Sequence, residues 1–136
     1  MRTWQAAKGP YGRPLAQKGT FSQKDGVMAA ESVADGCFLF EHGPIEAGER
    51  YAFIVKAKGC HCGGEVGWMD SLGVIHGMPR ARMSFADADK DGWREGRVIA
   101  TVPAGAEKLR LTLGLRQNPG ERTEYRDLAF YRLYRR

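Results

Sequence analysis

The chain has 136 residues, a formal net charge of +5 and a pI of about 9.3. A hydrophobic fraction of 43% and a charged fraction of 27% are typical of a folded globular protein, and the length fits one domain, residues 1–136. No run of 18 apolar residues occurs, which excludes a membrane-spanning helix. The basic charge favours anionic partners, such as acidic glycans, nucleic acid or membrane surfaces, unless it serves solubility alone.

Strand-like segments recur along the chain, separated by turn residues. Residues 1–20 are rich in Gly, Pro, Lys and Gln and are expected to be irregular or to form a weak first strand. Strands are then predicted at residues 27–31, 37–41, 51–58, 65–70, 74–75, 80–85, 93–102, 109–116 and 123–134. Because no window keeps a 3.6-residue apolar period, we expect an all-β fold of antiparallel strands, a sandwich or barrel.

The clearest strand is residues 109–116, where four leucines alternate with other residues. Leu109, Leu111, Leu113 and Leu115 share one face, and Arg110, Thr112, Gly114 and Arg116 share the other. Such a strand has one face on a core and the other in water. The outward face is therefore the place where a ligand is expected.

Three segments carry a resemblance to a known family. They are residues 45–58 (IEAGERYAFIVKAK), Trp93 followed by residues 101–111 (TVPAGAEKLRL), and residues 126–131 (RDLAFY). Their order and spacing over residues 27–134 resemble carbohydrate-binding modules of the family 4/9 type. This resemblance implies a two-sheet jelly-roll sandwich of the galactose-binding-like fold. It also implies a non-catalytic, secreted accessory domain, attached to an enzyme that acts on a polysaccharide.

The chain departs from the family pattern at the expected calcium site. Arg126 stands where the family has the first Asp of an Asp-Asp pair, and only Asp127 remains. Because Ca²⁺ needs about six oxygen ligands and a cation repels it, no calcium is expected at that place, and no other cofactor is predicted. Because the chain starts at a Trp that normally comes later in the family, its first strand is expected to be missing or replaced.

Sugar binding requires flat aromatic faces together with hydrogen-bonding groups on one surface. The candidate binding residues are Trp68, His76, Arg82, Arg110, Thr112, Arg116 and Tyr125. The guanidinium groups suit vicinal hydroxyls, a uronate or a sulfate. Tyr125 is interpreted as the exposed aromatic residue of the last strand. Trp68 shares a face with Val66 and would otherwise belong to the core, and Trp93 is interpreted as core.

Other chemistries have weaker support in the sequence. Cys37, Cys60 and Cys62 allow at most one disulfide, and the run Cys60-His61-Cys62 lacks the second pair of ligands that a zinc site needs. We interpret the acidic segment with Asp87, Asp89 and Asp91 as a solvated turn, with a loose calcium-binding turn as the alternative. No Gly-x-Ser-x-Gly motif and no phosphate loop occurs.

The alternatives to a polysaccharide-binding module are a structural or protein-interaction sandwich, a small lyase or hydrolase, and a nucleic-acid binder. A nucleic-acid binder is disfavoured because the sequence lacks an interleaved aromatic and basic motif. No membrane partner is expected. The N-terminus has no apolar run behind its basic residue, so it is not a signal peptide. The chain is therefore either cytoplasmic or, as the resemblance implies, an extracellular or cell-surface module of a larger protein.

Overall fold

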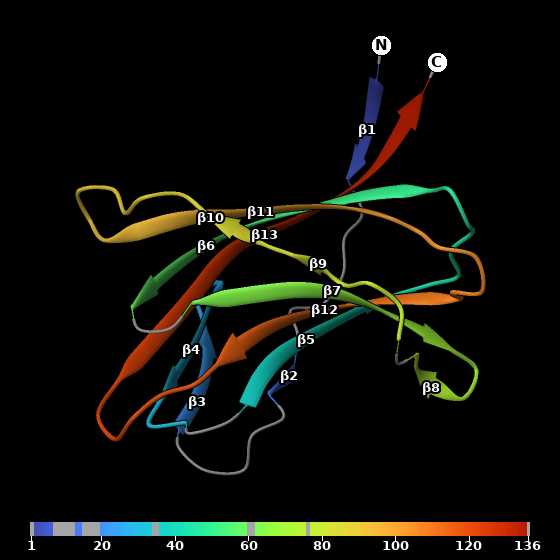
Figure 1. Ribbon diagram of the computed structural model, residues 1–136. Helices are drawn as coiled ribbons and strands as arrows, with labels where there is room; N and C mark the ends of the chain where they lie inside the picture. Colours follow the sequence, from blue (N-terminus) through green and yellow to red (C-terminus); the bar gives the residue numbers. More distant parts are fainter. Residues whose placement is uncertain are drawn as a thin grey trace.

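The computed structural model describes the backbone of residues 2–6, 13–14, 20–33, 36–59, 62–75 and 77–135, and the side chains within residues 20–133 of these ranges. These ranges contain strands and no helix, so no helix here could cross a membrane (Figure 1). The strands are β1 Arg2–Ala6, β2 Arg13–Pro14, β3 Thr20–Lys24, β4 Val27–Glu31, β5 Gly36–His42, β6 Arg50–Gly59, β7 Gly63–Asp70, β8 Gly73–Val74, β9 Ala81–Arg82, β10 Ser84–Phe85, β11 Trp93–Thr101, β12 Lys108–Leu115 and β13 Arg122–Arg135.

The strands form two antiparallel sheets that pack face to face (Figure 1). Sheet A has seven strands in the order β10-β11-β6-β13-β4-β3, with β1 pairing along the C-terminal part of β13. Sheet B has six strands in the order β2-β5-β12-β7-β8, with β9 pairing with β7. The expected all-β, two-sheet antiparallel sandwich is therefore confirmed.

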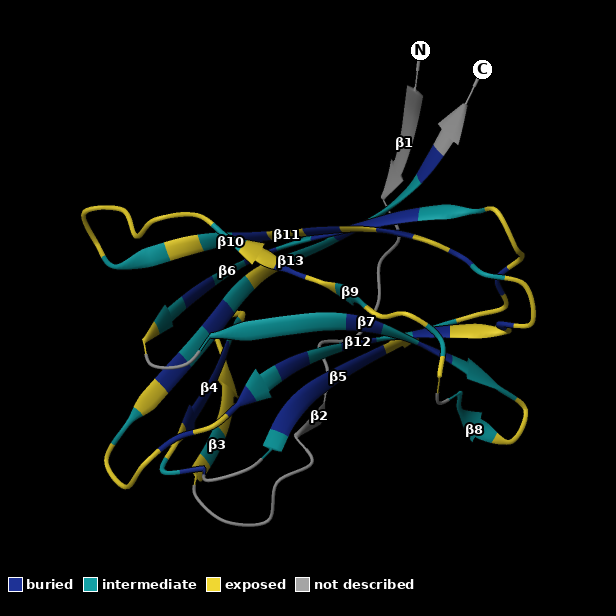
Figure 2. Cartoon of the chain, viewed as in Figure 1, coloured by how far each residue is buried: buried dark blue, intermediate teal, exposed yellow. Residues whose placement is uncertain are grey.

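The core lies between the two sheets and follows the period-2 pattern of the sequence. The four leucines of β12 are at most 2% exposed, and Tyr51, Phe53 and Val55 of β6 face them from sheet A. Figure 2 shows the same contrast along the chain, with buried strand positions and exposed connecting loops. The alternation predicted for β6 and β12 is thus confirmed, and it fixes which side chains of β12 point outward.

Strand β3 was not predicted, although a signal for it is present. Asp25 and Gly26 join β3 to β4 with φ values of 54° and 78°. An Asp-Gly pair with two positive φ angles forms the two-residue hairpin turn whose twist matches that of antiparallel strands. The pair Asp25-Gly26 therefore marks the β3–β4 hairpin.

Tyr125 faces the core, opposite to its expected facing, and a bulge after it changes the facing of the rest of β13. The pairing of β13 with β6 shifts register between Arg126 and Ala129, and Asp127 has a φ of 55°. An extra residue on one strand moves the following side chains to the opposite face. As a result both Tyr125 and Phe130 point into the core, at 0% and 3% exposed. The prediction that Tyr125 is the exposed aromatic residue was wrong.

Candidate functional site

The outer face of sheet B carries the polar residues of the central strand β12. Arg110 pairs in register with Glu41 of β5 on one side and Gly67 of β7 on the other, and Thr112 lies between Leu39 and Glu65. Because partners in register share a face, Arg110, Glu41, Thr112 and Glu65 come together on the surface opposite the leucines.

Two adjoining hollows lie on this face. The first, called the arginine hollow, has a volume of about 270 Å³ and is lined by Glu65, Gly67, Trp68, Val74, Arg80, Arg110 and Thr112. The second, called the apolar hollow, has a volume of about 360 Å³ and is lined by Cys62, Gly63, Gly64, Glu65, Arg82, Met83, Phe85, Thr112 and Gly114. Glu65 and Thr112 belong to both, so the two hollows form one groove along β7 and β12.

Glycines at outward positions leave the floor of the groove open. A Cβ added at Gly63 or Gly114 would meet no atom within 4 Å, and one at Gly67 would come no closer than 3.8 Å to Arg80 Nε. Gly63 and Gly114 also pair with one another across the β7–β12 ladder. A strand glycine often marks a place where a ligand or another backbone approaches closely, and here it creates room along the groove.

Carboxylates hold two of the groove arginines in position. Arg110 donates from Nε and Nη2 to Glu41 Oε2 at 3.2 and 3.0 Å, and Arg80 Nη1 donates to Glu65 Oε1 at 2.6 Å. Partly exposed pairs of this kind add little to stability. A guanidinium has five N–H donors, however, so each arginine keeps donors for a ligand while its plane is fixed. Arg82 lies opposite Glu65 in the register of β9 and β7, and it is exposed.

Tyr125 supports the floor of the groove from inside. Its hydroxyl donates to Gly114 O at 2.7 Å and accepts the Gly63 N–H at 3.1 Å. The side chain therefore reaches from sheet A across the core to the backbone of β7 and β12. Burial raises the pKa of the hydroxyl well above its ordinary value. Tyr125 is thus a structural residue beneath the groove, and it has no face that could stack on a sugar.

Trp68 forms part of the groove wall but is almost fully covered. It faces the core together with Val66, is 3% exposed, and donates from Nε1 to Pro79 O at 3.1 Å. The interpretation of Trp68 as a core residue is therefore confirmed. At 3% exposure the indole offers too little surface for a sugar to stack on its face.

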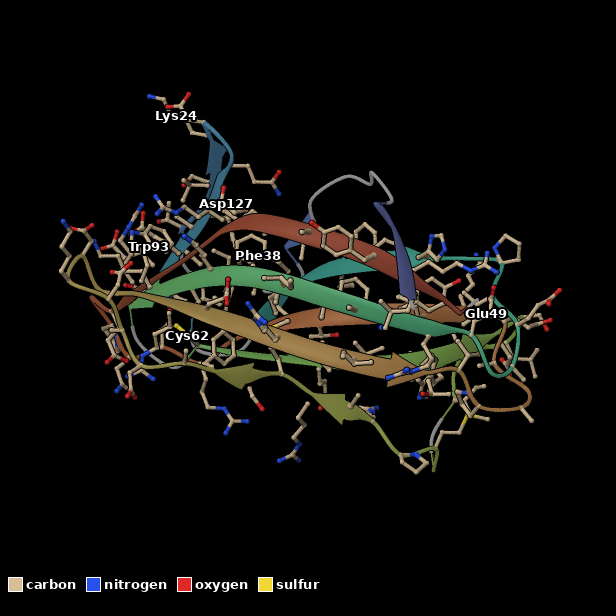
Figure 3. The ribbon with its side chains drawn as sticks, turned by 90° about the horizontal axis from the view of Figure 1, so that it is seen from above. Lys24, Phe38, Glu49, Cys62, Trp93 and Asp127 are labelled. Carbon is tan, nitrogen blue, oxygen red and sulfur yellow. The ribbon has the colours of Figure 1, made fainter. Side chains whose placement is uncertain are left out.

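Trp93 lies away from the groove, on the outer face of sheet A. It is partly exposed rather than buried, which corrects the expectation that it is a core residue. The Arg126 guanidinium carbon lies 3.9 Å from the ring centroid, and Lys58 Nζ lies 5.7 Å from it. Figure 3 shows Trp93 at the same end of the sandwich as Cys62, with Glu49 at the opposite end. Trp93 pairs in register with Lys58 and therefore faces outward, and the two cations cover part of its ring.

Four of the seven predicted binding residues line the groove: Trp68, Arg82, Arg110 and Thr112. Arg116 follows the end of β12, is exposed, and lines neither hollow. His76 lies outside the described residues. The sequence analysis missed Arg80, Glu65, Glu41 and the glycine floor. Outward-facing glycines within strand patterns, such as Gly67 and Gly114, were the available signal.

The acidic turn of residues 87–92 has a local structural role. Asp89 Oδ1 accepts the backbone N–H groups of Asp91 at 2.8 Å and Trp93 at 3.0 Å. The hydrogen bond from Trp93 is the main reason that the pKa of Asp89 is lowered. Among the side chains that the structure describes, no group of three His, Cys, Asp or Glu residues is arranged to hold a metal ion. Cys60 and His61 lie outside the described residues.

Comparison with known proteins finds solved structures of similar fold. No protein-family model matches the chain, and no curated protein sequence matches it. The enzymatically active domain of tailspike protein 4 from bacteriophage CBA120 is similar, with a TM-score of 0.60 and 10% identity over 96% of this chain. The CBM22-1–GH10 modules of xylanase 10B from Clostridium thermocellum, complexed with xylohexaose, match with a TM-score of 0.60 and 14% identity over 90%.

A structure of CBM4 is similar at a TM-score of 0.57 and 16% identity, covering 83% of this chain and 75% of that one. The chain spans 19% of the tailspike structure and 26% of the xylanase structure. At these identities the likeness establishes the fold alone, a two-sheet antiparallel jelly-roll sandwich.

Proposed function

We propose that the chain is a non-catalytic carbohydrate-binding module of the family 4/9 type, which binds an acidic polysaccharide in the groove of sheet B. The observation that carries this proposal is the open groove over outward-facing glycines, bordered by Arg80, Arg82 and Arg110. The similarity of the fold to CBM4 and to the CBM22-containing xylanase supports it.

The preference for an acidic glycan follows from the groove lining. Neutral sugars are commonly held by stacking on aromatic faces, and the aromatic residues on the described walls are the buried Trp68 and the half-buried Phe85. Cationic side chains on this face, including Lys108 at the end of β12, outnumber its two carboxylates, Glu41 and Glu65. Charge-assisted hydrogen bonds to carboxylate or sulfate groups therefore replace stacking as the main source of affinity.

The ion pairs of the two carboxylates support a binding role rather than catalysis. Glu41 and Glu65 lie two strands and two residues apart on the outer face of sheet B. Each carboxylate is also engaged by an arginine. Glycoside hydrolysis needs two carboxyl groups that flank the bond to be broken, one of them acting as proton donor, whereas both carboxylates here are held in ion pairs with arginines. The module is accordingly proposed to act as an accessory domain of a larger secreted or cell-surface protein, holding a catalytic domain on its polymer.

Affinity electrophoresis against polysaccharide panels tests this proposal. Polygalacturonate, alginate and heparin should retard the wild-type protein, and neutral xylan and glucomannan should not. Retardation should weaken between about 50 mM and about 300 mM salt because added ions screen the charges. Arg110→Ala should weaken binding at least roughly tenfold, about 1.4 kcal/mol.

Arg97→Ala is the matched control, because Arg97 is exposed on the outer face of sheet A and pairs with Glu95. It should bind as the wild type does. Equal retardation by neutral and acidic polymers, or equal losses in the two variants, would contradict the proposal. No retardation on any polymer would favour the alternative of a structural or protein-interaction sandwich.

A further inference from the structure

The two halves of the groove differ in the chemistry that they offer. The arginine hollow presents Arg80 and Arg110, each with N–H donors left over from its ion pair. The side walls of the apolar hollow are Met83, Phe85 and Cys62 over a glycine floor. A ligand that fills both halves therefore needs a charged group and an apolar group close together.

Sugar hydroxyls can pair with the polar residues at the border of the apolar hollow, but they fit its side walls poorly. A hydroxyl that leaves water without a new hydrogen-bond partner loses free energy, and Met83, Phe85 and Cys62 offer no strong partner. A methyl group gains from the same surroundings, by roughly fourfold in affinity for each methyl-sized group that is buried. The walls thus favour a substituent that ends in a methyl group.

The polar border of the apolar hollow matches a carbonyl next to such a methyl group. Arg82 lies at its edge on β9, exposed, and among the described residues no ion pair engages it. Its guanidinium can donate to a carbonyl oxygen. Thr112, which borders both hollows, can donate or accept a hydrogen bond. A methyl group attached to a carbonyl is an acetyl group.

The spacing of the two hollows places the charge and the acetyl group on neighbouring parts of an extended chain. Arg110 and Gly114 are four residues apart on β12, or about 13 Å along the strand. We propose that the groove selects acidic polysaccharides that carry acetyl groups, with a carboxylate in the arginine hollow and the acetyl methyl in the apolar hollow. This inference rests on the proposed function, because it assigns the ligand class of the same groove.

Isothermal titration with paired ligands that differ only in the acetyl group tests the inference. In one arm, chemically O-acetylated polygalacturonate is compared with its unacetylated parent. In the other, hyaluronan oligosaccharides are compared with N-formyl equivalents, which lack the methyl but keep the amide. Within each pair the two ligands carry the same charge. We expect the acetylated ligand to bind roughly fourfold to tenfold more tightly in at least one arm, and that arm identifies whether the acetyl group is on oxygen or nitrogen.

Variants that fill one hollow at a time locate the effect. Gly114→Val projects into open space in the apolar hollow and should abolish the preference for the acetylated ligand while binding to the parent polymer persists. Gly67→Val fills the arginine hollow and should weaken both ligands alike, and Thr101→Val, exposed on sheet A, should change neither. If Gly114→Val fails to fold, Gly63→Val replaces it, with the same loss of preference expected because its side chain would also project into open space in the apolar hollow.

The outcomes separate the inference from the function on which it rests. Equal affinity for acetylated and unacetylated acidic ligands in both arms overturns the acetyl inference and leaves acidic-glycan binding intact. Absence of binding to every acidic polymer overturns the proposed function itself. A preference for acetyl groups that survives Gly114→Val, or Gly63→Val where it replaces that variant, also overturns the inference, because the methyl would then bind elsewhere.

Discussion

Replacing Tyr125 with Phe isolates the hydroxyl that links the two sheets beneath the groove. In the wild type this group donates to Gly114 O at 2.7 Å and accepts the Gly63 N–H at 3.1 Å, from a side chain that is 0% exposed. Each net hydrogen bond contributes about 1 kcal/mol, so Tyr125→Phe should lower the free energy of unfolding by about 2 kcal/mol. The ring remains and continues to contact Phe38 edge to face.

Urea and thermal unfolding measure this loss. For a domain of this size, about 2 kcal/mol corresponds to a fall in Tm of roughly 6 to 10 °C and a fall in the urea midpoint of about 1 M. Tyr125→Leu serves as the comparison, because it removes the ring as well and should cost about 1 to 2 kcal/mol more. A loss below about 0.5 kcal/mol in Tyr125→Phe would refute the bridging role of the hydroxyl.

Three further predictions concern residues outside the groove. Burial lowers the pKa of His42 below its ordinary 6.5, so the unfolded chain takes up a proton at a higher pH than the folded protein does. The free energy of unfolding should therefore fall as the pH drops below about 6.5. In His42→Gln this fall should be lost, and an unchanged pH dependence in urea titrations would contradict the prediction. Arg126→Ala should lower stability by about 0.5 to 1 kcal/mol and alter Trp93 fluorescence, whereas Arg97→Ala should do neither. Asp127 has a φ of 55°, a conformation that a β-branched residue adopts poorly and glycine adopts readily. Asp127→Val should therefore lower the free energy of unfolding by about 1 to 2 kcal/mol, whereas Asp127→Gly should not. Equal thermal stabilities of the two variants would count against strain at the bulge.

The strand pattern was readable from the sequence wherever one face of a strand is buried. The alternation in residues 51–58 and 109–116 predicted β6 and β12 and the facing of their side chains, because the side-chain period of a strand is 2. It also placed Arg110 and Thr112 on the outer face, where they now line the groove. These features are local, and local spacing is sufficient to specify them.

Only the tertiary structure decided which residues from different strands meet. Glu65 and Arg80 are 15 residues apart, and Glu41 and Arg110 are 69 apart; sheet pairing brings each pair together, and no spacing rule in one sequence predicts it. Tyr125 was misplaced for a related reason, because alternation shows which side chains of β13 share a face but only pairing with β4 and β6 decides which face is buried. The bulge at residues 126–129 then exchanges the two faces of the strand that follows it. The sequence by itself determined strands with one buried face, such as β6 and β12, whereas long-range register determined which residues meet in the groove.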